Sequence, residues 1–166
     1  MEVYEIKDAY YCADKEYRDI RKAVRAVIFD NKGNILAEET KKPYVFMLPG
    51  GKLEDDESVR DCVIRECAEE CGLVVEPEEE LFAIKEYYKD KIFYTTYVKC
   101  AIKGECIKSL TDNENKLGLN CVWRCLSEAE KTAVKLEKFY SSGSELEGMH
   151  RRERTALGAI KEIFKA

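Results

Sequence analysis

The chain has 166 residues, of which 45% are hydrophobic, and this suits one compact domain that folds without disulfides or a structural metal. Its formal net charge of −5 at pH 7 argues against a long footprint on DNA or RNA, because such surfaces are rich in lysine and arginine. No stretch has the pattern of a signal peptide or a membrane span, so we expect a soluble protein of the reducing cytoplasm.

The chain divides into an N-terminal extension, residues 1–20, and a main domain, residues 21–166. The extension fits no clear pattern. We expect it to add an edge strand or an arm to a partner, and a homodimer is one open alternative. From Lys22 to Glu39, apolar and polar residues alternate on both sides of a DNKG turn. This pattern predicts a β-hairpin.

A helix is predicted after the next short strand. The strand YVFML stops at a proline and two glycines, and the helix that follows ends at Gly72, the residue type that most often terminates a helix. A strand, a glycine turn and a helix in this order often build a phosphate site.

The second half of the chain contains a second hairpin, another strand and two helices. LFAIKEYY and IFYTTYVKCAI form the hairpin, and LNCVWRCL forms the strand. SEAE at Ser127 and SELE at Ser144 resemble capping boxes that open the helices. Mixed strands and helices with antiparallel hairpins predict an α/β fold, an α/β/α sandwich around a mixed β-sheet.

The eight cysteines favour small hydrophobic residues with free thiols over disulfides or zinc. Three of them lie on the predicted helix, and others interrupt strand-like runs. Cys121 and Cys125 lack a second CxxC pair, and His150 is the only histidine, so the spacing argues against a zinc site.

The predicted helix carries carboxylates at its unfavourable end. Glu66, Glu69 and Glu70 share about one third of the helix surface at 100° per residue. The helix dipole prefers cations there, and like charges four residues apart repel by about 0.2–0.5 kcal/mol. Mg²⁺ would remove the conflict, because it prefers oxygen ligands and binds through carboxylates and substrate phosphates.

The segment from Gly51 to Leu73 resembles the Nudix box, GX5EX7REUXEEXGU, in which U is a bulky aliphatic residue. The matching residues are Gly51, Glu57, Arg65, Glu66, Glu69, Glu70, Gly72 and Leu73. Cys67 departs from the pattern at the first U position, where a small apolar side chain can still face the core.

This resemblance implies a Nudix-type hydrolase that uses Mg²⁺ or Mn²⁺ to cleave the diphosphate linkage of a nucleoside diphosphate joined to another moiety. It assigns Glu66, Glu69 and Glu70 as metal ligands, with the backbone carbonyl of Gly50. The resemblance also implies that Arg65 and Glu57 orient those carboxylates, and Glu66 is our choice of catalytic base.

Other site residues are left open by the sequence. Family members use either a carboxylate of the box or one on a later loop as the base, and Glu114 or Asp112 could supply the latter. Tyr44, Phe46 and Tyr88 could stack on a nucleotide base, as could Trp123, although aromatic residues in strands usually pack in the core.

Two features bear on how the site works. AEET at positions 37–40 lacks the basic residues that many relatives carry there. The alternative to an enzyme is a Nudix-fold regulatory module that binds a nucleotide without cutting it. The chain keeps every carboxylate of the box, which favours the enzyme.

Overall fold

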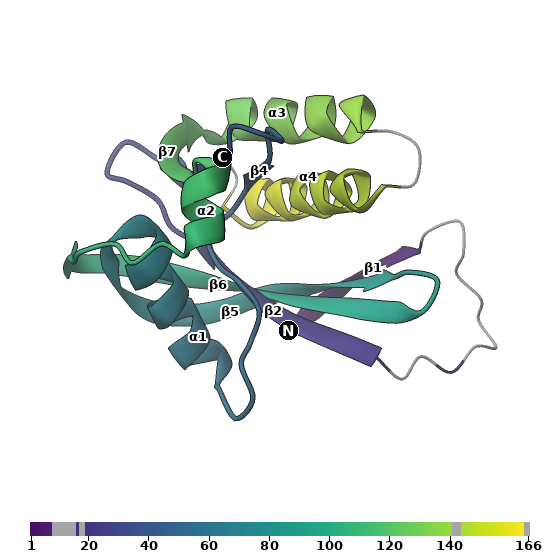
Figure 1. The fold of residues 1–166 in the computed structure, drawn as a ribbon, viewed down its shortest axis with the longest axis horizontal. Coiled ribbons are helices and arrows are strands. Elements are labelled where there is room, and N and C mark those ends of the chain that lie inside the picture. The colour runs from purple at the N-terminus through teal and green to yellow at the C-terminus, as the bar shows by residue number, and fades with distance from the viewer. Residues whose placement is uncertain (8–15, 17–18, 141–143, 165–166) are drawn as a thin grey trace.

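The computed structural model describes residues 1–7, 16, 19–140 and 144–164 (Figure 1). The elements in chain order are β1 (Glu2–Lys7), β2 (Asp19–Val27), β3 (Asn34–Glu39), β4 (Phe46–Met47), α1 (Val59–Glu66), the π-helical turn η1 (Cys67–Cys71), β5 (Leu73–Tyr87), β6 (Lys91–Glu105), α2 (Asp112–Leu117), β7 (Asn120–Cys125), α3 (Leu126–Phe139) and α4 (Glu145–Phe164).

The strands form two sheets. The larger sheet has four strands in the order β1-β5-β6-β2, and the smaller has three in the order β4-β3-β7. β5 and β6 pair antiparallel as the predicted second hairpin, while β1 and β2 add in parallel at the two edges. The larger sheet is therefore mixed, as predicted from the sequence.

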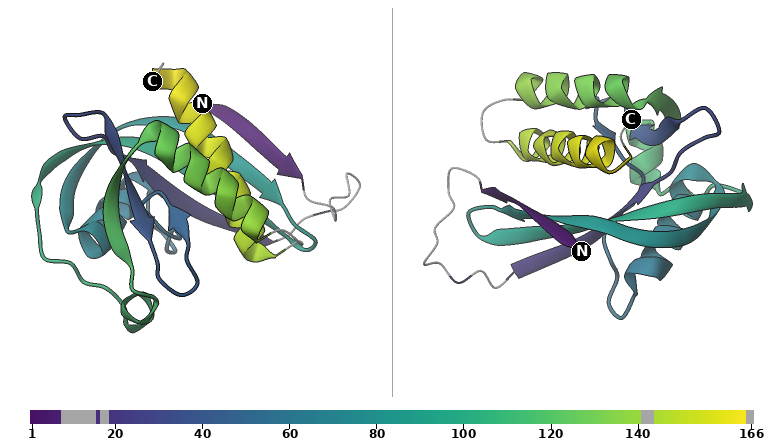
Figure 2. Two further views of the ribbon diagram at one scale, coloured as in Figure 1. Left: turned by 90° about the horizontal axis from the view of Figure 1, so that it is seen from above. Right: turned by 180° about the vertical axis from the view of Figure 1, so that it is seen from behind.

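Helices cover both faces of the larger sheet. Figure 1 and the right-hand view of Figure 2 show α3 and α4 side by side above it and α1 on the opposite face. This arrangement confirms the expected α/β/α sandwich. No helix among the described residues is long and apolar enough to cross a membrane.

The alternation of side chains along the strands creates two cores. Val24 and Ala26 of β2 face α1, whereas Val27 of the same strand joins the core under α3 and α4. β6 divides similarly, with Val98 toward α1 and Tyr97 toward α4. The strands are thus buried on both faces where the two cores meet.

The hairpin predicted from Lys22 to Glu39 is confirmed only next to its turn, where Phe29 pairs antiparallel with Ile35 and the N–H of Leu36 donates to the carbonyl of Ile28 at 3.0 Å. Its extent is wrong, because the two strands pair with other strands beyond that point. β2 pairs with β6, and β3 pairs with β4 and β7 in the other sheet. The turn itself is present, because Asp30 accepts the backbone N–H of Asn34 at 2.8 Å. Alternation identifies strands but does not choose their partners, and the chain crosses between sheets at this turn.

One of the two predicted capping boxes is also wrong. α3 begins at Leu126 after Cys125, so Ser127 lies inside the helix and caps nothing. At α4 the Ser144 hydroxyl does accept the N–H of Glu147 at 3.2 Å. A complete capping box lies between Thr111 and Glu114 at the start of α2, where the sequence analysis placed a loop.

At the N-terminus, β1 is an edge strand of the larger sheet and pairs with β5. Residues 8–15 and 17–18 of the expected extension lie outside the described residues. The seven described cysteines are free, and four of them are buried, as expected of small hydrophobic residues. Cys106 and Cys125 are exposed, so for Cys125 the expectation of a core position is wrong.

Candidate active site

The loop before α1 requires its glycines. Gly50 has a φ of 136°, and any β-carbon there would collide with the carbonyl oxygen of Val24. A β-carbon on Gly51 would collide with the carboxylate of Glu66. The N–H of Val24 donates to the Gly51 carbonyl at 2.9 Å, which ties the loop to β2. The loop backbone therefore lies directly between the sheet and the first predicted metal ligand.

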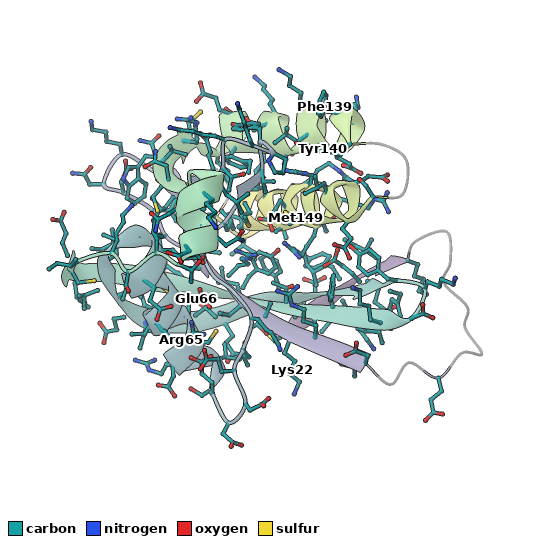
Figure 3. The ribbon with its side chains drawn as sticks, viewed as in Figure 1. Lys22, Arg65, Glu66, Phe139, Tyr140 and Met149 are labelled. Carbon is teal, nitrogen blue, oxygen red and sulfur yellow. The ribbon has the colours of Figure 1, made fainter. Side chains whose placement is uncertain are left out.

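Arg65 holds three of the box carboxylates in place. Its Nε and Nη2 donate to the two oxygens of Glu57 at 2.7 and 3.0 Å, which is the paired geometry that arginine favours with carboxylates. Its Nη1 donates to Glu66 at 2.9 Å and to Glu69 at 3.2 Å. Figure 3 shows Arg65 and Glu66 at the end of α1.

The two ends of this ion-pair network have opposite electrostatics. The hydrogen bond from Arg65 lowers the pKa of Glu57 to about 2, so that carboxyl is a permanent anion at neutral pH. Burial and the neighbouring Glu70 raise the pKa of Glu66 to about 7, despite Arg65. Glu66 is therefore held where an added cation would favour its charged form.

Glu70 lies deeper than Glu66 and faces a second buried carboxyl. Its Oε2 accepts the N–H of Gly50 at 3.4 Å. Glu38 on β3 is only 1% exposed. Burial raises the pKa of both carboxyls, and for Glu38 the charge of Glu70 adds to the effect. The sequence analysis missed Glu38, although AEET had drawn attention to a strand without basic residues.

Arg25 on β2 is a cation whose charge acts on Glu38 and Glu70. One of its Nη atoms donates to the carbonyl oxygens of Leu48, at 2.8 Å, and Gly50. Its Nε is buried without a hydrogen-bond partner. The Gly50 carbonyl expected to bind metal thus has one bond from Arg25 and keeps a second lone pair.

The last two carboxylates of the box lie in a π-helical turn. η1 follows α1 directly and ends at Gly72, whose φ of 68° confirms the predicted helix terminus. Turns of this kind are rare and often occur at functional sites. Here the turn carries Glu69 and Glu70 away from the regular helical positions assumed from the sequence.

A cavity of about 270 Å³ lies on the opposite face of the larger sheet, between the sheet and α4. Gly51 belongs to its lining, which connects it with the carboxylate site. Figure 3 shows Met149, another lining residue, on α4. The cationic and aromatic residues of the lining are Arg21, Arg25, Lys91, Arg152, Tyr88 and Phe93.

This cavity offers binding groups without partners. Thr95 is 1% exposed, lines the cavity, and its hydroxyl has no hydrogen-bond partner. Buried polar groups are normally paired, so an orphan hydroxyl beside a cavity indicates a place for a polar ligand. Arg21 and Lys91 both lie over the ring of Phe93, at 5.4 and 5.1 Å from its centroid.

An ion-pair network from α4 supports both sites. Arg152 is buried and donates to Glu86 at 3.4 Å and Glu153 at 3.1 Å. The other oxygen of Glu153 accepts the N–H of Leu48 at 3.0 Å, next to the glycine loop. The basic segment of α4, residues 150–154, is therefore not a solvated surface throughout, because His150 and Arg152 are buried.

The other predicted site residues are dispersed. Tyr88 lines the cavity and donates its hydroxyl to Glu86 at 2.8 Å. Phe46 is fully buried in the core under α3 and α4, so its ring has no free face. Tyr44 lines a separate hollow beside α3, and the carboxylate of Glu114 accepts the N–H of Thr111 in the cap of α2.

Comparison with known proteins agrees with this geometry. The family model of the NUDIX domain matches residues 19–141, which is most of the chain. The chain belongs to the Nudix family. It is by that membership a Nudix-type hydrolase, and the box that the sequence pattern indicated is the segment that folds into the glycine loop, α1 and η1.

Solved Nudix structures share the fold at low sequence identity. A NUDIX hydrolase from Nitrosomonas europaea has a TM-score of 0.59 and 18% identity, over 83% of this chain and 90% of that one. The E. coli ORF135 protein has a TM-score of 0.56 and 22% identity, over 68% and 79%. A MutT protein from Methanosarcina mazei Go1 has a TM-score of 0.51 and 21% identity, over 69% and 83%.

Proposed function

We propose that this protein hydrolyses the diphosphate linkage of a nucleoside diphosphate joined to another moiety, with a divalent cation such as Mg²⁺ or Mn²⁺. One observation carries the proposal. Glu66 and Glu70 are buried close together, and burial raises the pKa of both carboxyls. They lie beside the glycine loop, whose residue Gly51 lines the cavity that contains the cationic residues. Such a pair of carboxylates is costly to charge unless a cation joins it.

The cluster of glutamate side chains at the end of α1 suits a hard divalent cation. Glu66, Glu69 and Glu70 would hold it, with the free lone pair of the Gly50 carbonyl as a further oxygen ligand. When bound, the cation would neutralise diphosphate charge and lower the pKa of the attacking water, which would then lose its proton more readily. Arg65 and Glu57 act as positioning residues, because their paired hydrogen bonds hold Glu66 and Glu69 in one orientation.

Glu66 is our proposal for the base that takes the proton of the attacking water. Its carboxylate lies against Gly51, which lines the cavity, and a bound cation would keep that carboxylate in the charged form that accepts a proton. The capping role of Glu114 leaves that residue as the second choice, since its carboxylate already serves α2.

The cavity supports a nucleotide as the substrate. Arg21 and Lys91 supply positive charge for phosphates, and the rings of Tyr88 and Phe93 offer apolar surface for a base. The hydroxyl of Thr95 lacks a partner and would gain one from a polar group of the substrate. Which nucleotide fits is a question for the experiment below.

The test is the release of phosphate-containing products from a panel of nucleotides with Mg²⁺. The panel contains nucleoside triphosphates, dinucleoside polyphosphates, NDP-sugars and ADP-ribose. We expect turnover of at least one member, lost in Glu66→Gln and kept in Glu80→Gln, a control on an exposed part of β5. No turnover of any member, together with nucleotide binding by calorimetry, would replace the enzyme by a nucleotide-binding regulatory module.

A further inference from the structure

Three metal-binding side chains meet behind the helix end, next to the carboxylates proposed for Mg²⁺. Glu38 on β3 lies directly opposite Cys121 on β7 in the antiparallel pair. Cys71 closes the turn η1. The Glu38 carboxylate and the two thiols offer ligand atoms that all lie within 4.8 Å of one another. We call these three residues the thiol–carboxylate cluster.

The spacing of the cluster matches tetrahedral zinc. Zinc binds thiolate sulfur at about 2.3 Å and carboxylate oxygen at about 2.0–2.2 Å, and a tetrahedral angle then separates sulfur from oxygen by about 3.5–3.7 Å. Cys71 Sγ lies 3.5 Å from Glu38 Oε1. Little movement is needed to place one ion in contact with all three ligand atoms.

An independent observation also indicates a missing cation. Glu38 is a carboxyl with 1% exposure, and its neighbours are the carboxyl of Glu70 and two thiols. The charge of Arg25 acts on Glu38, but the Nη1 of Arg25 donates to the carbonyls of Leu48 and Gly50. The contacts of Glu38 are the thiol of Cys71, which donates to it at 3.5 Å, and the carboxyl of Glu70, and among the described residues no cation touches it. A buried carboxyl in such surroundings is costly to charge unless a cation joins it.

We infer that the thiol–carboxylate cluster is a second metal site, which binds a thiophilic divalent cation of the zinc class. Two sulfur ligands select such an ion over Mg²⁺, which prefers oxygen throughout. The thiols bind as thiolates and release their protons to the solvent. Three protein ligands leave one position of the tetrahedron open.

This site could not be found from cysteine spacing. The sequence argued against zinc because Cys121 and Cys125 have no partner pair, and the structure agrees that Cys125 is exposed and apart from the cluster. The thiol that does approach Cys121 is Cys71, which folding brings from a different element. Cys121 Sγ also lies 3.4 Å from the carbonyl oxygen of Glu70, so the cluster abuts the helix end.

The bound ion would contact three elements of the fold at once. It would tie η1 to both β3 and β7, and thereby fix the segment that presents Glu69 and Glu70. We therefore expect zinc to stabilise the folded protein, because an ion that binds only the native state raises the melting temperature by mass action.

The first test uses Co²⁺ as a spectroscopic substitute for zinc in reduced, metal-free protein under anaerobic conditions. Thiolate ligands give Co²⁺ an intense sulfur-to-metal absorption that carboxylates cannot give. We expect this absorption to appear at one Co²⁺ per chain, to be removed by an equivalent of Zn²⁺, and to survive a large excess of Mg²⁺. The readout needs no substrate, so it is independent of the proposed hydrolysis.

Matched variants locate the ligands. Cys121→Ser and Glu38→Gln should each weaken Co²⁺ binding at least tenfold, and Cys121→Ser should also reduce the absorption per ion. Cys125→Ser, an exposed cysteine on the same strand, should leave both unchanged. The proposal is overturned if no sulfur absorption appears, if Cys121→Ser leaves it intact, or if Mg²⁺ displaces the ion.

A second measurement on the wild-type protein guards against variants that fail to fold. Alkylation of each cysteine is followed by mass spectrometry with and without Zn²⁺. Zinc should slow the modification of Cys71 and Cys121 at least tenfold and leave exposed Cys106 and Cys125 unaffected. Equal alkylation rates with and without zinc at Cys71 and Cys121 would overturn the site.

Discussion

Buried charge is treated differently on the two sides of the four-stranded sheet. On the side of α4, the buried carboxylates of Glu86 and Glu153 share Arg152, so anion and cation are both supplied by the chain. On the side of α1, the buried carboxyl of Glu70 lies close to those of Glu38 and Glu66, and of these three Glu66 is paired with Arg65.

The difference separates what holds the fold together from what awaits a ligand. A buried ion pair is strongly destabilising to break but adds little when complete, so the α4 network serves to fix positions. Carboxyls that crowd one another lower the stability of the free protein and gain from an added cation. We therefore expect the α1 side to gain stability when a cation binds, whereas the α4 side already contains its cation.

The largest effect is expected in activity, on the α1 side of the sheet. Glu70→Gln should lower kcat/KM for the best nucleotide by about 10²–10³-fold, the size seen when one electrostatic contact to the reacting group is removed. The free protein should be as stable or slightly more stable, since the change relieves repulsion worth some tenths of a kcal/mol. Steady-state kinetics and urea unfolding measure the two effects. Near wild-type turnover with an unchanged thermal shift by Mg²⁺ would refute the assignment.

The opposite result is expected on the α4 side. Arg152→Met should reduce the free energy of unfolding by about 3–5 kcal/mol, because it leaves Glu86 and Glu153 buried without their cation. Adding Glu86→Gln to that variant should recover part of the loss. Urea unfolding without metal gives both values. A loss below about 1 kcal/mol would mean that this network behaves like an exposed ion pair.

A smaller effect is expected where a positioning residue is changed conservatively. Arg65→Lys keeps the charge but cannot donate to Glu57 and Glu66 in the same paired geometry. Activity and Mg²⁺ affinity should fall by about 10–100-fold. Arg60→Lys is the control on the same helix, since Arg60 donates to the carbonyl of Pro77. Equal results for the two variants would argue that Arg65 does not orient the carboxylates.

The smallest effect is a pH dependence on the α4 side. Burial lowers the pKa of His150, the only histidine, which accepts the N–H of Phe46 at 3.3 Å through Nε2. Its neighbours Arg152 and Glu153 act in opposite directions on that pKa. The unfolded chain therefore binds more protons than the native protein below about pH 6.5, and stability is lost as the pH falls.

The measurement is the slope of unfolding free energy against pH in wild type and in His150→Gln, which retains a donor and an acceptor. The wild type should lose stability faster on acidification, by no more than about 1.4 kcal/mol per pH unit, the limit for one proton. The carboxyls on the α1 side titrate in both proteins and cancel in the difference. Parallel slopes would show that His150 binds a proton as readily in the native protein as in the unfolded chain.

The sequence predicted most of the strands, the helix of the box and its glycine terminus, because these depend on local patterns. It could not predict that β2 and β3 enter different sheets, since both satisfy the same alternation. The carboxylates that we propose as metal ligands were identified through a motif with fixed spacing. Glu38, Arg25 and Thr95 were not, because each reaches its site through pairing between strands distant in the chain.

The π-helical turn at Cys67–Cys71 changes how this motif can be transferred to other proteins. Transfer of the 23 residues from Gly51 to Leu73 onto a regular α-helical scaffold would reproduce the sequence of the motif but misplace its carboxylates. On a uniform helix, the final glutamates would project at a different angle from Glu66. The wide turn is as much a part of the motif as its carboxylates, and a graft has to import that irregularity with the strands that support it.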